Sequence, residues 1–149
     1  MRSGHLQEVT RTFQRILLST VSSDSHTWNL VFMQLLLEES GREVLNLGPC
    51  VPDELLLKTA RHEQPDAVVV STVNGHGLTD GARVARLLRR CPATSHIPLM
   101  IGGKLGTSGG SEEATAEDLL TAGFDFVFTD DSDPSALVDR LVLLKAVSG

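Results

Sequence analysis

The residues with the clearest chemical potential form an Asp-x-His pair in a short polar loop. Asp24 and His26 lie in the segment 23–29, between an apolar run at 16–21 and a second one at 30–37. On an extended loop this spacing lets the carboxylate bind one imidazole nitrogen and leaves the other nitrogen free to ligate a metal. Because the same pair also occurs in helix caps and plain surface loops, it is a weak indication by itself.

The order of apolar runs and breaks shows which elements must position this pair. Strands are predicted at 16–21, 42–48, 66–71, 97–101 and 124–128, and helices at 30–37, 52–62, 79–90, 111–121 and 133–147. The connections are short enough to require parallel pairing through right-handed crossovers. The pattern predicts an α/β fold, a flavodoxin-like (Rossmann-like) doubly wound five-stranded parallel sheet in the order 2-1-3-4-5. Residues 1–14 are predicted as a polar lead-in and 15–149 as one domain.

Two other strand ends carry residues with special chemistry. Ser71, Thr72 and Val73 end the predicted third strand, and Gly102 and Gly103 follow the fourth. In the predicted order the first and third strands are neighbours beside the switch point, where ligands of such sheets bind. We therefore expect the Asp-x-His loop and the end of the third strand to face one crevice, with the glycine pair at its border.

Together these strand ends resemble the signature of cobalamin-binding domains that hold the cofactor with its lower base displaced and a histidine below cobalt. The signature reads Asp-x-His-x-x-Gly, Ser-x-Leu and Gly-Gly, and this chain matches it with Asp24-x-His26, Ser71-x-Val73 and Gly102-Gly103. The resemblance covers the chain from about residue 16 onward. It is closest to the small subunit of methylaspartate mutase (glutamate mutase), in which segments matching 23–26, 46–48, 74–77 and 102–103 follow in the same order. The chain departs from the signature at Asn29, where a glycine is usual, and at Val73.

The resemblance implies adenosylcobalamin as the cofactor. His26 would be the lower axial ligand of cobalt, and Asp24 would support its imidazole. The displaced dimethylbenzimidazole tail would enter a slot between the first and third strands, where Ser71 offers a hydroxyl. The residues expected to contact the cofactor are Ser23, Asp24, Ser25, His26, Thr27, Ser71, Thr72, Val73, Gly102, Gly103, Lys104, Leu105, Gly106, Thr107 and Ser108.

The function that this resemblance implies is that of the cobalamin-binding small subunit of an adenosylcobalamin-dependent carbon-skeleton mutase. The crevice offers no convergent cluster of arginine and acid-base groups for an amino-acid substrate, so the substrate site is expected on a larger catalytic subunit, a TIM barrel, in a hetero-oligomer. Trp28 and the loop 74–77 are expected at that interface. The alternative is a stand-alone corrinoid carrier or a cobalamin-sensing regulatory module without mutase activity.

Two other classes share the predicted fold. A phosphoacceptor receiver domain needs an Asp at the end of the third strand, where this chain has Ser71, and a Lys at the end of the fifth, where it has Thr129 and Asp130. A flavodoxin would place aromatic side chains around its flavin, but this chain has no Tyr and one Trp. The residues therefore support the receiver-domain and flavodoxin hypotheses less well than the cobalamin-binding hypothesis.

Composition narrows the partners and the compartment. The formal net charge of -6 argues against nucleic acid. The four arginines at helical spacing are interpreted as a solvated helix face: Arg83, Arg86, Arg89 and Arg90. Cys50 and Cys91 form no CxxC pair, and no apolar run approaches the length of about 18 residues that a membrane span requires. We expect a cytoplasmic protein that binds no membrane.

Overall fold

The computed structural model describes residues 14–72, 77–103, 112–128, 139 and 141. Val73, the loop 74–76 and the segment 104–108 lie outside the described residues. So do nearly all of the predicted lead-in at 1–14 and most of the predicted last helix at 133–147, of which Asp139 and Leu141 are described and are helical.

Five parallel strands form one sheet in the order β2-β1-β3-β4-β5. The strands are β1 (Arg15–Ser19), β2 (Glu43–Asn46), β3 (Ala67–Thr72), β4 (Leu99–Gly103) and β5 (Phe126–Phe128). The helices between them are α2 (Trp28–Glu39), α3 (Asp53–Glu63), α4 (Gly77–Arg90) and α5 (Glu112–Ala122). The predicted fold class and strand order are confirmed.

All five strands differ from the prediction by one or two residues at one or both ends, and the starts of β4 and β5 have an identifiable cause. β4 begins at Leu99 rather than 97, because the Ile97 N–H bonds back to the Thr94 carbonyl in a turn. β5 begins at Phe126 rather than 124, because the Phe124 N–H bonds to the Leu119 carbonyl and so completes the end of α5. In both cases the residues are apolar enough to be predicted as part of a strand. Their backbone N–H groups, however, donate to the preceding turn or helix.

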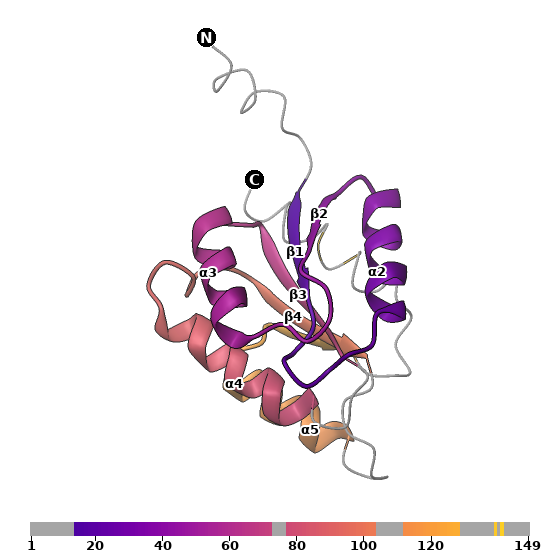
Figure 1. Ribbon diagram of the computed structural model, residues 1–149. Coiled ribbons are helices and arrows are strands. Elements are labelled where there is room, and N and C mark those ends of the chain that lie inside the picture. Colours follow the sequence, from indigo (N-terminus) through magenta and orange to yellow (C-terminus); the bar gives the residue numbers. More distant parts are fainter. Residues whose placement is uncertain (1–13, 73–76, 104–111, 129–138, 140, 142–149) are drawn as a thin grey trace.

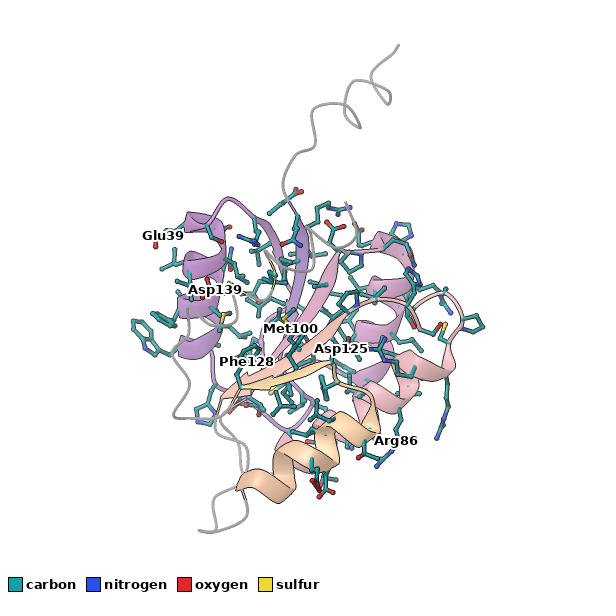
Figure 2. All side chains as sticks on the ribbon, turned by 180° about the vertical axis from the view of Figure 1, so that it is seen from behind. Glu39, Arg86, Met100, Asp125, Phe128 and Asp139 are labelled. Atoms are coloured by element: carbon teal, nitrogen blue, oxygen red, sulfur yellow. The ribbon has the colours of Figure 1, made fainter. Side chains whose placement is uncertain are left out.

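The central strand β3 is buried over its whole length, as a parallel strand covered on both faces must be. Its side chains alternate between two apolar cores. One core joins Val68 and Val70 to residues of α3, α4 and α5. The other joins Ala67 and Val69 to α2 and to Leu141. Figure 1 shows α2 on one side of the sheet and α3, α4 and α5 on the other, and Met100 and Phe128 lie on the α2 side (Figure 2).

The interpretation of the four α4 arginines as one solvated face is wrong for two of them. Arg86 and Arg90 are exposed, as expected, and Figure 2 shows Arg86 at the outside of the molecule. Arg83 pairs with carboxylates near the site, as described below. Arg89 donates from Nε to the Gly123 carbonyl at 2.9 Å and from Nη2 to Asp125 at 2.8 Å.

Arg89 also reaches the segment that leads into β4. Its Nη1 atom donates to the carbonyl oxygens of Ser95 and Ile97, both at 2.8 Å. The Asp125 carboxylate that it holds accepts in turn from the Leu99 N–H at 2.8 Å. Arg89 therefore ties the end of α4 to the start of β4 and to the turn before β5.

We predict that Arg89→Gln lowers the free energy of unfolding by about 2 kcal/mol, because several hydrogen bonds from a charged donor are lost at once. Arg86→Gln, on the same helix but exposed, should change it by less than about 0.5 kcal/mol. Urea denaturation followed by circular dichroism measures both. Equal stabilities of the two variants would show that the Arg89 contacts contribute nothing measurable.

Candidate functional site

The loop between β1 and α2 is braced at its backbone by the connection between β2 and α3. The Asp24 N–H donates to the Val21 carbonyl at 3.0 Å, which closes a turn. The Asp24 carbonyl accepts from the Cys50 N–H at 2.7 Å, and the Thr20 hydroxyl donates to the Gly48 carbonyl at 2.9 Å. The backbone around the Asp-x-His pair is therefore fixed by residues from another part of the chain.

Within this loop Asp24 and His26 form the contact that their spacing allows. Asp24 Oδ1 lies 2.7 Å from His26 Nδ1 and accepts the His26 backbone N–H at 2.9 Å. The Asp24 side chain is 1% exposed and that of His26 is 60% exposed. The carboxylate thus sits inside the protein and the imidazole stands at the surface, with Nδ1 engaged. Among the described residues, Nε2 of His26 has no hydrogen-bond partner.

The other oxygen of the same carboxylate is held by β3. Thr72 Oγ1 donates to Asp24 Oδ2 at 2.6 Å, and both side chains are almost fully buried. Sequence reasoning named Thr72 as a cofactor contact but gave it no part in holding Asp24. The alternation of side chains along β3 indicates the face on which Thr72 lies. Thr72 shares that face with Val68 and Val70, opposite to the face of Ser71.

Ser71 and Gly102 are neighbours in the sheet, on the face that α2 covers. The register pairs Ser71 with Gly102 and Thr72 with Gly103. A Cβ atom added at Gly102 would lie 3.5 Å from Cβ of Phe128 and 3.6 Å from its carbonyl oxygen, which is ordinary contact. Packing among the described residues therefore does not require a glycine at this position, and a close approach by a ligand is a separate reason for one.

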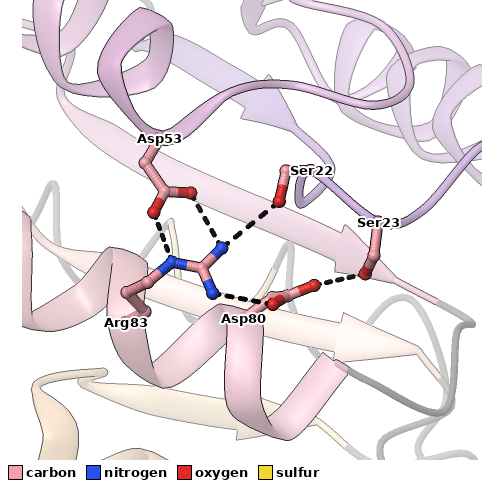
Figure 3. A network of polar contacts seen from close by, with 5 residues as sticks. All are labelled: Ser22, Ser23, Asp53, Asp80 and Arg83. Carbon is pink, nitrogen blue, oxygen red and sulfur yellow. Dashed lines mark hydrogen bonds and ion pairs between the residues drawn. The ribbon is translucent and has the colours of Figure 1, made fainter.

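A second polar network lies on the other side of the loop (Figure 3). Arg83 of α4 pairs with Asp53 at the start of α3 and, through Nη1, with Asp80 Oδ1 at 2.9 Å. The second oxygen of Asp80 accepts the Ser23 hydroxyl, and Arg83 Nη2 donates to Ser22 at 3.2 Å. The hydrogen bonds that Arg83 donates to Asp53, and then to Asp80, raise its pKa above the ordinary value.

Sequence reasoning missed Asp53, Asp80 and Arg83 as neighbours of the site. An acid one helical turn before Arg83 was visible in the sequence as a possible ion pair. The contact with the Ser22 and Ser23 hydroxyls was not, because it joins residues about sixty positions apart in the chain. Ser25 and Thr27, two further predicted contact residues, are exposed loop positions.

The described residues contain no group of three or more His, Cys, Asp and Glu side chains that could hold a metal ion. Because Nδ1 of His26 is engaged by Asp24, Nε2 is the ring nitrogen that could serve as a ligand. None of the described helices has the length and apolar character needed to cross a membrane.

Comparison with known families gives this arrangement a class. The B12 binding domain family matches residues 14–138, a span that includes the Asp-x-His loop, β3 and the glycine pair. The chain therefore belongs to the B12-binding domain family.

Individual relatives make the class more specific. The chain is 30% identical over 115 residues to a glutamate mutase sigma subunit of Fusobacterium nucleatum, covering 77% of this chain and 84% of the relative. It is 27% identical over 126 residues to glutamate mutase sigma subunit 2 of Haloarcula marismortui, covering 85% of this chain and 84% of the relative. The resemblance to glutamate mutase small subunits found in the sequence is confirmed.

Solved structures confirm the fold more broadly. A cobalamin-binding protein from Desulfitobacterium hafniense superposes with a TM-score of 0.71 at 23% identity, and the match covers 87% of this chain and 60% of that one. A chemotaxis response regulator of Vibrio cholerae superposes with a TM-score of 0.66 at 16% identity, covering 89% of this chain and 99% of that one. Both likenesses show shared architecture alone, and β3 ends in Ser71 and Thr72 rather than in a phosphoacceptor Asp.

We predict that Thr72→Val lowers the free energy of unfolding by about 2 kcal/mol, because a hydrogen bond to a buried charged group is lost at nearly constant volume. Thr72→Ser keeps the hydroxyl and should cost less than about 1 kcal/mol. Urea denaturation of the two variants tests the difference. If Thr72→Val is as stable as Thr72→Ser, the hydroxyl does not stabilise Asp24.

Proposed function

We propose that this chain is the cobalamin-binding small subunit of an adenosylcobalamin-dependent carbon-skeleton mutase of the methylaspartate (glutamate) mutase type. The observation that carries the proposal is the imidazole of His26, exposed at the carboxyl edge of the sheet and bonded through Nδ1 to the buried Asp24. Ligands of such sheets bind at that edge. Membership of the B12-binding family and similarity to glutamate mutase sigma subunits support the same assignment. In this proposal residues 15–149 form the binding domain.

In this function His26 would hold the cobalt of the cofactor through Nε2. Asp24 would accept a hydrogen bond from Nδ1–H, which would fix the tautomer and make Nε2 a better electron-pair donor to the metal. Thr72 holds Asp24 from the opposite side, at 2.6 Å. Thr72, Asp24 and His26 form a chain of contacts from the buried strand β3 to the surface. In this proposal the chain orients the imidazole before the cofactor binds.

The displaced nucleotide tail would lie beside the sheet on the α2 side. Ser71 and Gly102 are adjacent there, and Ser71 offers a hydroxyl as a hydrogen-bond partner. A Cβ atom at Gly102 would make only ordinary contacts with the described residues, so their packing does not require a glycine there. These two positions support the proposed slot, and the predicted lining at 104–108 remains a proposal.

Adenosylcobalamin, when bound, supplies the radical chemistry of carbon-skeleton rearrangement. The chain's own part is to bind the cofactor and present it at an open sheet edge. Since radical chemistry needs a site closed to water, we propose that a larger catalytic subunit, a TIM barrel, covers that edge and binds the amino-acid substrate. Trp28, 77% exposed two residues after His26, is well placed to contact that subunit.

The first test concerns the metal ligand. The purified chain should bind cobalamin with the lower base displaced, and its cob(II)alamin form should show nitrogen hyperfine splitting that changes when the protein is labelled with nitrogen-15 histidine. His26→Ala should abolish this splitting and weaken binding by about 10-fold to 100-fold or more, as the loss of ligand support does at other metal sites.

A matched control is His62→Ala, because His62 is an exposed histidine on α3. This variant should bind and give the same spectrum as the parent protein. If His26→Ala leaves the spectrum and affinity unchanged, His26 is not the ligand and the proposed function loses its main support.

The second test concerns the partner. The chain with adenosylcobalamin and glutamate should give no methylaspartate until a cognate large subunit is added. Trp28→Ala should weaken assembly by on the order of tenfold, since exposed aromatic residues are common anchors at interface centres. Its effect on cofactor affinity should be smaller.

Leu120→Ala is the control for assembly, because Leu120 is an exposed apolar residue near the end of α5, away from the carboxyl edge. It should assemble normally. Turnover by the isolated chain would contradict the two-component proposal. Cofactor binding without any effect of a large subunit would favour the stand-alone carrier or sensor.

A further inference from the structure

The network in Figure 3 joins the loop of the candidate site to two helices on the far side of the sheet. Arg83 is its centre. Nε and Nη2 of Arg83 donate to the two oxygens of Asp53, and Nη1 donates to Asp80 Oδ1 at 2.9 Å. Because the donors of a guanidinium lie in a rigid plane, bonds to two carboxylates fix the orientation of the Arg83 group.

Two hydroxyl groups of the loop bond to this network. Asp80 is 8% exposed, and its second oxygen accepts the hydroxyl of Ser23, the residue before Asp24. Arg83 Nη2 donates to the hydroxyl of Ser22 at 3.2 Å. Neither contact involves the Asp24 side chain. The loop is therefore held from α4 at 22–23, independently of the bond between Asp24 and Thr72.

We propose that Arg83 and Asp80 are positioning residues that fix the loop 22–26 before the cofactor binds, so that His26 is already presented in its ligating orientation. This inference rests on the proposed function. It adds residues from α4, outside the signature positions, to those on which cofactor binding depends.

The physical effect of such a brace is on the fraction of molecules ready to bind. When a loop samples several conformations, the apparent dissociation constant rises in inverse proportion to the competent fraction. A loop held by charge-assisted hydrogen bonds to Arg83 and Asp80 loses little further freedom when the ligand arrives. Loss of the brace should therefore slow association and leave dissociation nearly unchanged.

The first experiment uses the full chain without cofactor. Amide hydrogen exchange is measured at Asp24, His26 and Cys50, whose N–H groups donate to the Val21 carbonyl, to Asp24 Oδ1 and to the Asp24 carbonyl. In Arg83→Gln and in Asp80→Asn these amides should exchange about tenfold faster than in the parent protein, as expected for a loop released by that factor. Unchanged exchange in both variants would overturn the inference, whatever the role of His26.

The second experiment measures cobalamin association and dissociation rates. Arg83→Gln and Asp80→Asn should associate about tenfold more slowly with nearly the same dissociation rate. Arg86→Gln controls for the loss of one positive charge on α4 and should bind like the parent protein. Arg89→Gln controls for a loss of global stability, because its contacts lie at the other end of the helix.

The controls separate the inference from its alternatives. If Arg89→Gln slows association as much as Arg83→Gln does, the effect is general destabilisation and the inference is wrong. If His26→Ala retains the parent spectrum, the proposed function fails, while the exchange experiment still decides whether α4 holds the loop. Normal exchange and normal association in the Arg83 and Asp80 variants would refute the positioning role and leave the proposed function intact.

Discussion

The burial of the Asp24 carboxylate is the constraint on which the site depends. A charge removed from water costs several kcal/mol unless donors replace its hydration, so on general grounds a side chain that is 1% exposed must be surrounded by them. Its two oxygens accept from Thr72 Oγ1 and from the His26 backbone N–H, and Oδ1 also lies 2.7 Å from His26 Nδ1. Meeting the needs of one carboxylate thus connects the first strand loop to the central strand and turns the imidazole outward.

The loop around Asp24 is held on two further sides by unrelated contacts. The hydrogen bond from the Cys50 N–H and that from the Thr20 hydroxyl to the Gly48 carbonyl tie it to the connection before α3, and the Ser22 and Ser23 hydroxyls tie it to α4. Among the described residues no buried side-chain nitrogen or oxygen lacks a hydrogen-bond partner. A loop that is short, polar and at a sheet edge is thereby tied to the strands and helices around it.

Much of this arrangement could be predicted from the sequence because it depends on local pattern. The apolar runs identified each strand, the short connections indicated parallel pairing, and the Asp-x-His spacing predicted the contact between Asp24 and His26. The roles of Thr72, Arg83 and Arg89 could not be predicted in the same way. Each depends on a partner that becomes a neighbour only when the sheet is assembled, and an arginine at helical spacing looks the same in sequence whether it faces water or a carboxylate.

The distances along the chain have a consequence for the order of folding. Asp24 and His26 are two residues apart, yet Thr72 is 48 positions and Asp80 57 positions from the loop residue that each one binds. Contacts of such long range form after the entropy of closing the intervening chain has been overcome. A nascent chain that has reached only α3 therefore carries Asp24 and His26 without Thr72 and Asp80, which hold the loop. The loop that carries His26 therefore gains its last supports late, when β3 and α4 have docked.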